Sequence, residues 1–320
     1  MDLGEGSPRL CRIRSNLFHH EPRESRIAVG DEVRVDFQDS NDTGWILERL
    51  PRRTVLTRRA ADRTDSQVLV SNAETLIIVS AMKRPAYRFG VIDRLIAVGL
   101  QGGLTPVILF NKTDLAEAEE IDLPTRIYRD IGYRVIQTSV HLNLGLDGLK
   151  DHLSGSKSVL CGHSGVGKSS LIHALFPDWE IRIGEVNRKS GTGRHTTILA
   201  NMYSLPEGGW LVDTPGIREL MPYGMDPREL GDYFLEFIEP SESCRFKGCS
   251  HLKEPDCGVK QALEEGRITE ARYRTYSTIY ESLSSRGLFE GHPSSSGFFP
   301  DSLSFSMISK TRSFSDLEDD

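Results

Sequence analysis

The stretch Gly162-His-Ser-Gly-Val-Gly-Lys-Ser169 decides the fold, because it matches the pattern G-x-x-x-x-G-K-[ST]. It continues an apolar run, Ser158–Gly162, and opens a segment with helical spacing of apolar residues, Lys168–Phe176. Chance alone gives this pattern about 0.01 times in a chain of ordinary composition, and the order strand, loop, helix is the context that the motif requires. The sequence therefore predicts a phosphate-binding loop for a nucleoside triphosphate in an α/β domain.

Each residue type in this loop has a physical role. Glycines let the backbone fold around the phosphates so that its N–H groups point inward. Lys168 reaches the β- and γ-phosphates, and the hydroxyl of Ser169 ligates Mg²⁺. The residues expected to bind the nucleotide here are Gly162, His163, Ser164, Gly165, Val166, Gly167, Lys168, Ser169 and Ser170.

Strands alternate with helical segments on both sides of the loop, as in a parallel sheet covered by helices. The other expected strands are Leu76–Ala81, Thr105–Asn111, Arg134–Ser139, Ile198–Leu205 and Trp210–Asp213. The other expected helices are Phe89–Gln101, Leu123–Ile131 and Leu146–Leu153. The fold class is therefore α/β, with a doubly wound sheet.

A second phosphate-binding element, Asp213-Thr-Pro-Gly216, ends the last predicted strand. Asp213 can hold Mg²⁺ through water, and the N–H of Gly216 can meet the γ-phosphate. Ras-like enzymes place a Gln after this element to orient the attacking water, but here the residue is Ile217, which cannot hydrogen-bond water. Hydrolysis therefore needs another group or a partner.

The stretch Gly191-Thr-Gly-Arg-His-Thr-Thr197 lies between the phosphate-binding loop and Asp213, where the first switch of a GTPase belongs. Thr196 and Thr197 are candidates to contact the nucleotide, and the hydroxyl of Thr197 to ligate Mg²⁺ in the triphosphate state. His195 is the nearest candidate for a catalytic group. An ordinary flexible loop, and an exposed histidine with no role, are the alternatives.

The tetrapeptide Asn111-Lys-Thr-Asp114 follows another predicted strand and selects the base. The carboxylate of Asp114 can accept hydrogen bonds from N1 and N2 of guanine, whereas adenine offers no such pair of donors. We expect Lys112 to pack over the base plane, Asn111 to tie this loop to the phosphate-binding loop, and Ser139 to give its backbone N–H to guanine O6. With Thr113, these residues predict GTP as the nucleotide.

The order of these elements along the chain is permuted. In ordinary GTPases the phosphate-binding loop comes first, but here residues 111–114 and Ser139 precede Gly162. A parallel sheet tolerates reopening at a surface loop, because the neighbours of each strand are unchanged. The GTPase domain then ends just after Gly216, so the following residues are tethered to the element that contacts the γ-phosphate.

A cluster of metal-binding residue types follows the α/β domain. Cys244, Cys249, His251 and Cys257 supply three thiolates and one imidazole within fourteen residues, the complement for a closed tetrahedral Zn²⁺ site. Because no ligand position is left open, we expect one structural zinc per chain. Free thiols or disulfides are the alternative. Helical segments, Pro227–Phe237 and Val259–Leu283, flank the cluster.

The two ends of the chain differ from this middle. The first 65 residues have short β-like runs, namely Arg26–Val29, Glu32–Phe37, Gly44–Leu47 and Thr54–Leu56, which predict a small barrel or open sheet. The net charge of −7 argues against a uniformly basic nucleic-acid binder, yet the arginines of residues 49–63 give a local positive excess suited to phosphate or RNA contact. An ordinary solvated surface is the alternative. The Ser-rich residues 284–320 are expected to be disordered.

With these motifs in this order, the chain resembles the ribosome small-subunit-dependent GTPase A (RsgA, or YjeQ) family of circularly permuted GTPases. The resemblance implies an oligonucleotide-binding (OB-like) barrel at 1–65, a GTPase domain at 66–225, a zinc-binding helical module at 226–283 and a tail at 284–320. Cys11–Arg14 resembles the middle of the family's barrel, so we expect an incomplete barrel. The family's switch histidine falls on His195, and its zinc ligands fall on the four residues above.

The resemblance further implies GTP hydrolysis on the small (30S) ribosomal subunit late in its maturation, stimulated by that subunit, with contacts to 16S rRNA. We expect a cytoplasmic protein, because the sequence has no apolar run long enough to span a membrane and no signal peptide. We also expect a monomer. A nucleotide-gated binding module, in which the GTP state matters rather than turnover, is the alternative. A GTPase serving the large subunit or a membrane is a third interpretation.

Overall fold

A six-stranded sheet forms the centre of the computed structural model, which describes residues 10–13, 17–18, 26–37, 43–59, 66–177, 201–213 and 224–285. Its strand order is β10-β11-β9-β6-β7-β8, and β10 alone of these runs antiparallel to its neighbour. The strands are β6 (Thr75–Ala81), β7 (Thr105–Asn111), β8 (Arg134–Gln137), β9 (Lys157–Cys161), β10 (Asn201–Ser204) and β11 (Trp210–Asp213). This confirms the predicted doubly wound sheet.

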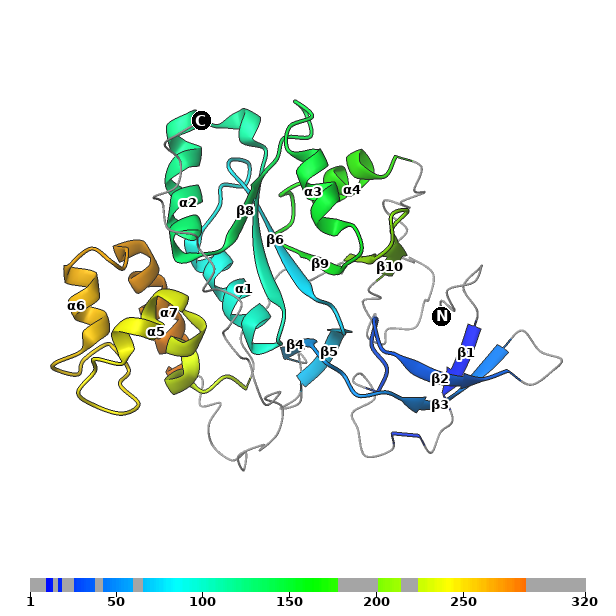
Figure 1. Cartoon of the computed structure of the whole chain (residues 1–320), viewed down its shortest axis with the longest axis horizontal. Helices are drawn as coiled ribbons and strands as arrows, with labels where there is room; N and C mark the ends of the chain where they lie inside the picture. The colour runs from blue at the N-terminus through cyan, green and yellow to red at the C-terminus, as the bar shows by residue number, and fades with distance from the viewer. Residues whose placement is uncertain are drawn as a thin grey trace, which may run out of the picture.

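Helices cover both faces of the sheet (Figure 1). The central strand β6 shows why: Leu76 and Ile78 pack into one core, and Ile77 and Val79 pack into the other. A strand buried on both faces reads as a continuous apolar run. One core takes the helices α1 (Phe89–Gln101) and α2 (Ala118–Ile131), and the other takes α3 (Leu146–Leu153) and α4 (Lys168–Leu175).

The expected N-terminal barrel is not confirmed. The described strands there form two separate ladders, a three-stranded sheet in the order β1-β3-β2 and a two-stranded ladder of β4 with β5. The strands are β1 (Leu10–Ile13), β2 (Val33–Asp36), β3 (Thr43–Arg49), β4 (Val55–Arg59) and β5 (Ser66–Ser71). The predicted strand Arg26–Val29 is wrong, because the turn at Gly30 (φ +90°) leaves it a single bridge to Val70.

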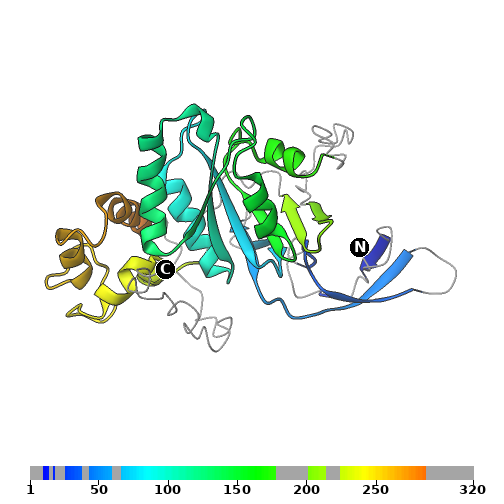
Figure 2. The ribbon, with the colours of Figure 1, turned by 45° about the horizontal axis from the view of Figure 1, so that its top comes forward.

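Residues 224–285 form a helical unit, called the C-terminal module below, that packs beside α1 (Figures 1 and 2). Its helices are the 3₁₀ helix η3 (Pro227–Tyr233), α5 (Leu235–Ser241), α6 (Gly258–Glu264) and α7 (Glu270–Ser285). The helical segment predicted for residues 259–283 consists of two helices: Gly266, at φ +75°, follows the end of α6, and α7 begins at Glu270. The predicted tail from residue 284 lies almost wholly outside the described residues.

No helix among the described residues is both long and apolar enough to cross a membrane.

Ion pairs of Arg52 and Arg53 reduce the positive charge excess expected around residues 49–63. Arg52 pairs with Asp31 at 2.7 Å, and the Asp31 side chain is 1% exposed. Arg53 pairs with Glu32 at 2.8 Å. Both acidic partners lie some twenty residues earlier in the chain, so a local count of charges cannot include them. The electrostatic case for RNA contact at this end is therefore weaker than the sequence indicates.

Asp31 joins three segments of the N-terminal region. It also accepts hydrogen bonds from the Ala28 amide and the Ser71 hydroxyl, each at 2.7 Å. Burial alone would raise the pKa of Asp31, but these hydrogen bonds and Arg52 outweigh it, and the pKa lies below its usual value. Asp31 therefore stabilises the fold while it is ionised.

Asp31→Asn should lower the free energy of unfolding by about 3 kcal/mol at pH 7, because it removes the buried carboxylate charge that pairs with Arg52. A folded-state pKa below the unfolded value means that the stabilisation is complete above about pH 4 and is lost as the pH falls through the folded-state pKa. The difference in free energy of unfolding between wild type and variant, measured by urea titration, should therefore shrink as the pH falls. The exposed pair of Arg34 with Glu48 provides the control, since Glu48→Gln should cost less than about 1 kcal/mol. An equal difference at pH 7 and at about pH 3 would contradict the prediction.

Candidate nucleotide site and metal centre

Four predicted motif segments meet at one edge of the sheet. The phosphate-binding loop follows β9, residues 111–114 follow β7, Thr138 and Ser139 follow β8, and Asp213 ends β11. All four strands are parallel, so their carboxyl ends lie on the same side. In open α/β sheets ligands bind at this edge.

The glycines of the phosphate-binding loop are required by its backbone. Gly162 has φ +152°, and a Cβ there would lie 2.2 Å from the carbonyl oxygen of Val79 on β6. Gly167 has φ +99° and begins α4, and a Cβ there would lie 2.4 Å from Asn111 Nδ2. Lys168 Nζ donates to the carbonyl oxygens of Gly162, at 2.7 Å, and His163, at 3.1 Å. The lysine thus lies across the loop in which a phosphate would bind.

Asn111 connects the two halves of the site. Its Nδ2 donates to the carbonyl oxygen of Val166 at 2.9 Å, and its Oδ1 accepts from Thr138 Oγ1 at 3.1 Å. The side chain is buried, with 2% exposed. The predicted tie between Asn111 and the phosphate-binding loop is therefore present. No sequence motif points to Thr138, although a hydroxyl beside a buried carboxamide is a natural partner for it.

Lys112 Nζ lies between two carbonyl oxygens at 2.6 Å each, those of Gly165 and Arg84. This ammonium group fixes the lysine stem at the edge of the site where a base would pack. No sequence motif points to the loop between β6 and α1, which carries Arg84. Its contribution is a backbone carbonyl, for which side-chain chemistry gives no signal.

Ser139 forms hydrogen bonds through both its backbone and its hydroxyl. Its backbone N–H, the donor predicted for guanine O6, donates to the carbonyl oxygen of Leu144 at 3.0 Å. Its hydroxyl donates to Asp114 Oδ1 at 2.5 Å and accepts from the amide of Leu142 at 3.1 Å. Ser139 therefore orients the carboxylate that is expected to read the base.

Asp213 lies close enough to Lys168 for their charges to interact. Burial raises the pKa of Asp213, and the positive charge of Lys168 opposes that rise. A partly buried carboxylate at a strand end beside a phosphate-binding loop has the chemistry of an Mg²⁺-holding group. His195, Thr196, Thr197 and Gly216, which complete the predicted site, lie outside the described residues.

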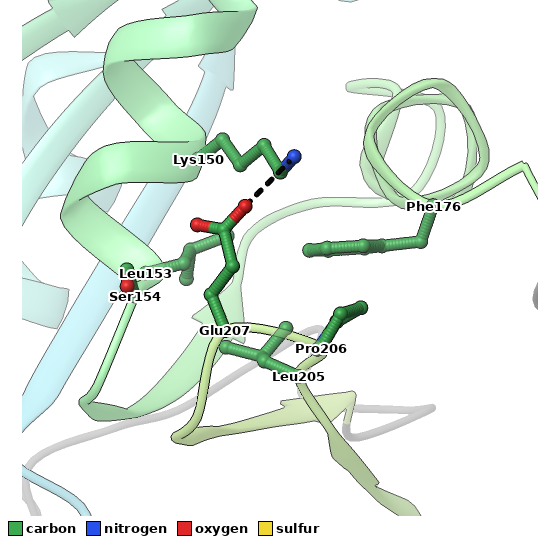
Figure 3. Close-up of a pocket in the computed structure, with 7 residues that line it drawn as sticks. All are labelled: Lys150, Leu153, Ser154, Phe176, Leu205, Pro206 and Glu207. Atoms are coloured by element: carbon green, nitrogen blue, oxygen red, sulfur yellow. Dashed lines mark ion pairs between the residues drawn. The ribbon is translucent and has the colours of Figure 1, made fainter.

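A pocket lies at the end of α4 that is far from the phosphate-binding loop (Figure 3). It is lined by Lys150, Leu153, Ser154, Phe176, Leu205, Pro206 and Glu207. Because α4 starts at the phosphate-binding loop, Phe176 at its far end belongs to the opposite edge of the sheet. Lys150 pairs with Glu207 at 3.0 Å beside the pocket.

The four predicted metal ligands come together in the C-terminal module. The ligand atoms of Cys244, Cys249, His251 and Cys257 all lie within 4.8 Å of one another. His251 Nδ1 is 3.6 Å from Cys244 Sγ and 3.5 Å from Cys257 Sγ, and these two sulfurs are 3.9 Å apart. Tetrahedral zinc with ordinary bond lengths requires about 3.8 Å between sulfurs and about 3.5 Å between sulfur and nitrogen. The donor set and its spacing therefore fit Zn²⁺.

Two tyrosines hold the metal-binding loop on α7. Tyr273 donates from its hydroxyl to the carbonyl oxygen of His251 at 2.7 Å, and Tyr276 donates to that of Ser250 at 2.8 Å. Gly231 of η3 leaves room for the imidazole, because a Cβ there would lie 3.2 Å from His251 Nε2. Burial lowers the pKa of His251, which favours the neutral imidazole that binds metals.

Sheet topology and motif order together define a circularly permuted GTPase fold. The base-binding strands β7 and β8 precede the phosphate-binding strand β9 in the chain but occupy the far side of β6 in the sheet. The chain belongs to the RsgA GTPase family, which matches residues 49–222.

Several relatives cover most of this chain. The small ribosomal subunit biogenesis GTPase RsgA of Christiangramia forsetii is 35% identical over 85% of this chain and 88% of its own. The protein of the same name from Moorella thermoacetica is 38% identical over 88% of this chain and 92% of its own. Among solved structures, YjeQ from Thermotoga maritima matches with a TM-score of 0.71 and 31% identity, over 88% of this chain and 92% of that one. YloQ, a circularly permuted GTPase, matches with a TM-score of 0.66.

Gly167→Ala should weaken the binding of GDP at least about tenfold. The added Cβ would overlap Asn111 Nδ2 and would force an alanine into a left-handed conformation that costs about 1–3 kcal/mol. A fluorescent GDP analogue can measure the affinity. Gly148→Ala is the matched control, because a Cβ there meets nothing within 4 Å. Affinity of Gly167→Ala within twofold of wild type would contradict the prediction.

Protein purified without chelators should contain about one zinc ion per chain by elemental analysis. Cys257→Ser should lose most of the metal and lower the melting temperature, because binding of a structural zinc contributes directly to folding. Cys11→Ser, in β1, should leave the zinc content unchanged. Absence of zinc from the wild type, or a full complement in Cys257→Ser, would contradict the assignment.

Proposed function

We propose that this protein hydrolyses GTP to GDP and phosphate and assists late maturation of the small ribosomal subunit. One observation carries the proposal: the loop that contains Asp114 is joined to the phosphate-binding loop. Ser139 orients the Asp114 carboxylate, and Asn111 of the same loop donates a hydrogen bond to the phosphate-binding loop. Relatives that are similar over most of both chains are named small ribosomal subunit biogenesis GTPase. This name is the reason for proposing the small subunit as the partner. Membership of a GTPase family favours turnover over a nucleotide-gated binding module.

The chain's own residues supply binding and orientation. Asp114 accepts from guanine N1 and N2, Lys112 packs over the base, and the N–H groups of residues 162–170 surround the phosphates. Lys168 leaves the carbonyl oxygens that it contacts and binds the β- and γ-phosphates. Ser169, Thr197 and Asp213 would hold Mg²⁺, which neutralises charge between these phosphates.

The remaining assignments extend this proposal. His195 is the candidate to assist the attacking water, and Thr196 and Gly216 are the candidates to contact the γ-phosphate. Ile217 cannot hydrogen-bond the attacking water, so the 30S subunit is the partner proposed to complete the site and stimulate hydrolysis. We also propose contact with 16S rRNA, a structural zinc, a monomer and a cytoplasmic location. The proposed limits are 1–65 for an incomplete OB-like barrel, 66–225 for the GTPase domain, 226–283 for the zinc module and 284–320 for the tail.

Phosphate release from GTP should rise at least about tenfold when purified 30S subunits are added, since a partner must complete the site. The same amount of 50S subunits should give no such increase. Lys168→Ala should lose the activity because it removes the charge that binds the phosphates. No stimulation by 30S subunits across a range of salt concentrations would overturn the proposal.

Contaminating GTPases on the subunits can be excluded with a change of nucleotide. Xanthine carries a carbonyl oxygen where guanine carries its N2 amino group, so Asp114→Asn should prefer XTP to GTP by reversing one donor and acceptor. This variant should release phosphate from XTP with 30S subunits, whereas wild type with XTP should not. Failure of Asp114→Asn with both nucleotides, while it remains folded, would contradict the role given to Asp114.

A further inference from the structure

A turn with two exposed leucines, residues 139–144, follows β8 beside Asp114, the carboxylate that is expected to read the base. Leu142 and Leu144 of this turn are 62% and 50% exposed. Leu146, two residues further on, is 7% exposed and packs into the core that contains α3 and α4. The chain therefore reaches the core through Leu146, and the core does not account for the two leucines of the turn.

Hydrogen bonds fix the direction of the Leu144 side chain. Ser139 and Leu144 form an antiparallel bridge, in which each N–H donates to the carbonyl oxygen of the other residue, at 3.0 and 2.9 Å. Residues directly opposite each other in such a pair carry their side chains on the same face. The Ser139 hydroxyl donates to Asp114 Oδ1 at 2.5 Å. The Leu144 side chain therefore lies on the face of the turn that is directed toward Asp114.

The backbone of the turn is held at several points. The amide of Leu142 donates to the Ser139 hydroxyl at 3.1 Å, so this amide and the Asp114 carboxylate share one oxygen atom as partner. Gly145 ends the turn against β8, because a Cβ there would overlap the carbonyl oxygen of Gln137. The position of Leu144 is thus preorganised, and binding of a ligand does not have to order it.

Lys112 and Leu144 lie on opposite sides of Asp114. The strand order β9-β6-β7-β8 places β7, whose end carries Asp114, between β6 and β8. Lys112 Nζ is held by the carbonyl oxygens of Gly165, which follows β9, and Arg84, which follows β6. Leu144 is held at the end of β8, on the other side of β7. A flat ring whose polar edge meets Asp114 would therefore have an apolar lysine stem on one side and a leucine on the other.

We propose that Leu144 is a base-binding residue of the nucleotide site. Its side chain covers the guanine ring from the side of β8, opposite the stem of Lys112, while Asp114 reads the polar edge. Sites for small ligands combine such apolar walls with a few polar groups that fix orientation. Because a leucine side chain makes no hydrogen bond, Leu144 adds affinity without distinguishing one purine from another. The inference rests on the proposed binding of GTP and adds a residue to that site.

Leu144→Ser should weaken the binding of GDP about fivefold, because it removes the apolar area that the ring would cover. Leu144→Met keeps that area and should bind GDP within twofold of wild type. Both variants should fold, since the wild-type side chain is half exposed and the bridge to Ser139 uses only backbone atoms. Isothermal titration calorimetry with unlabelled GDP measures the affinities. Leu123→Ser is the matched control, because Leu123 of α2 is 56% exposed and lies outside the turn, and it should bind GDP like wild type.

Inosine diphosphate separates a contact with the ring from an indirect effect through Asp114. This nucleotide keeps the ring but lacks the N2 amino group that donates to Asp114. Leu144→Ser should weaken GDP and inosine diphosphate by the same factor, so the ratio of the two affinities should match that of wild type. A merely structural role, in which the turn moves Asp114, would lower that ratio. On 30S subunits the variant should raise KM for GTP about fivefold at unchanged kcat, because the ring contact is the same in the ground state and the transition state.

Affinity of Leu144→Ser for GDP within twofold of wild type would overturn the proposal. A change of more than threefold in the ratio of the GDP and inosine diphosphate affinities would also overturn it. If wild type binds GDP but shows no hydrolysis with 30S subunits, the proposed function fails, and the GDP titrations still decide the role of Leu144. If wild type binds no GDP, both proposals are wrong.

Discussion

The nucleotide site depends on one buried carboxamide, that of Asn111. It donates to the phosphate-binding loop and accepts from Thr138, so one side chain aligns the ends of β7, β8 and β9. A buried carboxamide with unmade hydrogen bonds is costly, so the three loops are held together or the site is destabilised as a whole. The glycine at position 167 follows from the same contact, because any Cβ would occupy the place of Asn111 Nδ2.

This constraint acts in space and not along the chain, which is why the permuted order is compatible with the site. The strand β6 pairs with β9 on one side and β7 on the other, so the phosphate-binding and base-binding strands keep their places whichever is made first. Permutation changes instead what is attached to the ends. The C-terminal module, from residue 224 on, comes after β11 in the chain, and β11 ends at Asp213 beside the phosphate-binding loop.

The sequence predicts best where the pattern is local. The apolar run of β6, the loop at residues 162–169 and the four metal ligands each lie within a short stretch whose chemistry has few alternatives, and the structure brings each together. The predictions fail where contacts between residues far apart in the chain determine the structure. The single bridge of Val29 to Val70 and the pairing of Asp31 with Arg52, 21 residues apart, depend on contacts that no local pattern reveals. The roles of the switch residues and the incomplete barrel stay predictions.

The C-terminal module shows the same division between local and distant information. Its metal ligands span fourteen residues, so zinc can close the loop that carries them but cannot orient the module on the GTPase domain. Orientation requires a contact between residues far apart in the chain, and the pair of Asp93 with Arg272, 179 residues apart, is such a contact. An arginine in a helix of mixed composition looks like a surface residue in the sequence, and only its burial between the carboxylates of Asp93 and Glu236 reveals that it joins the two units.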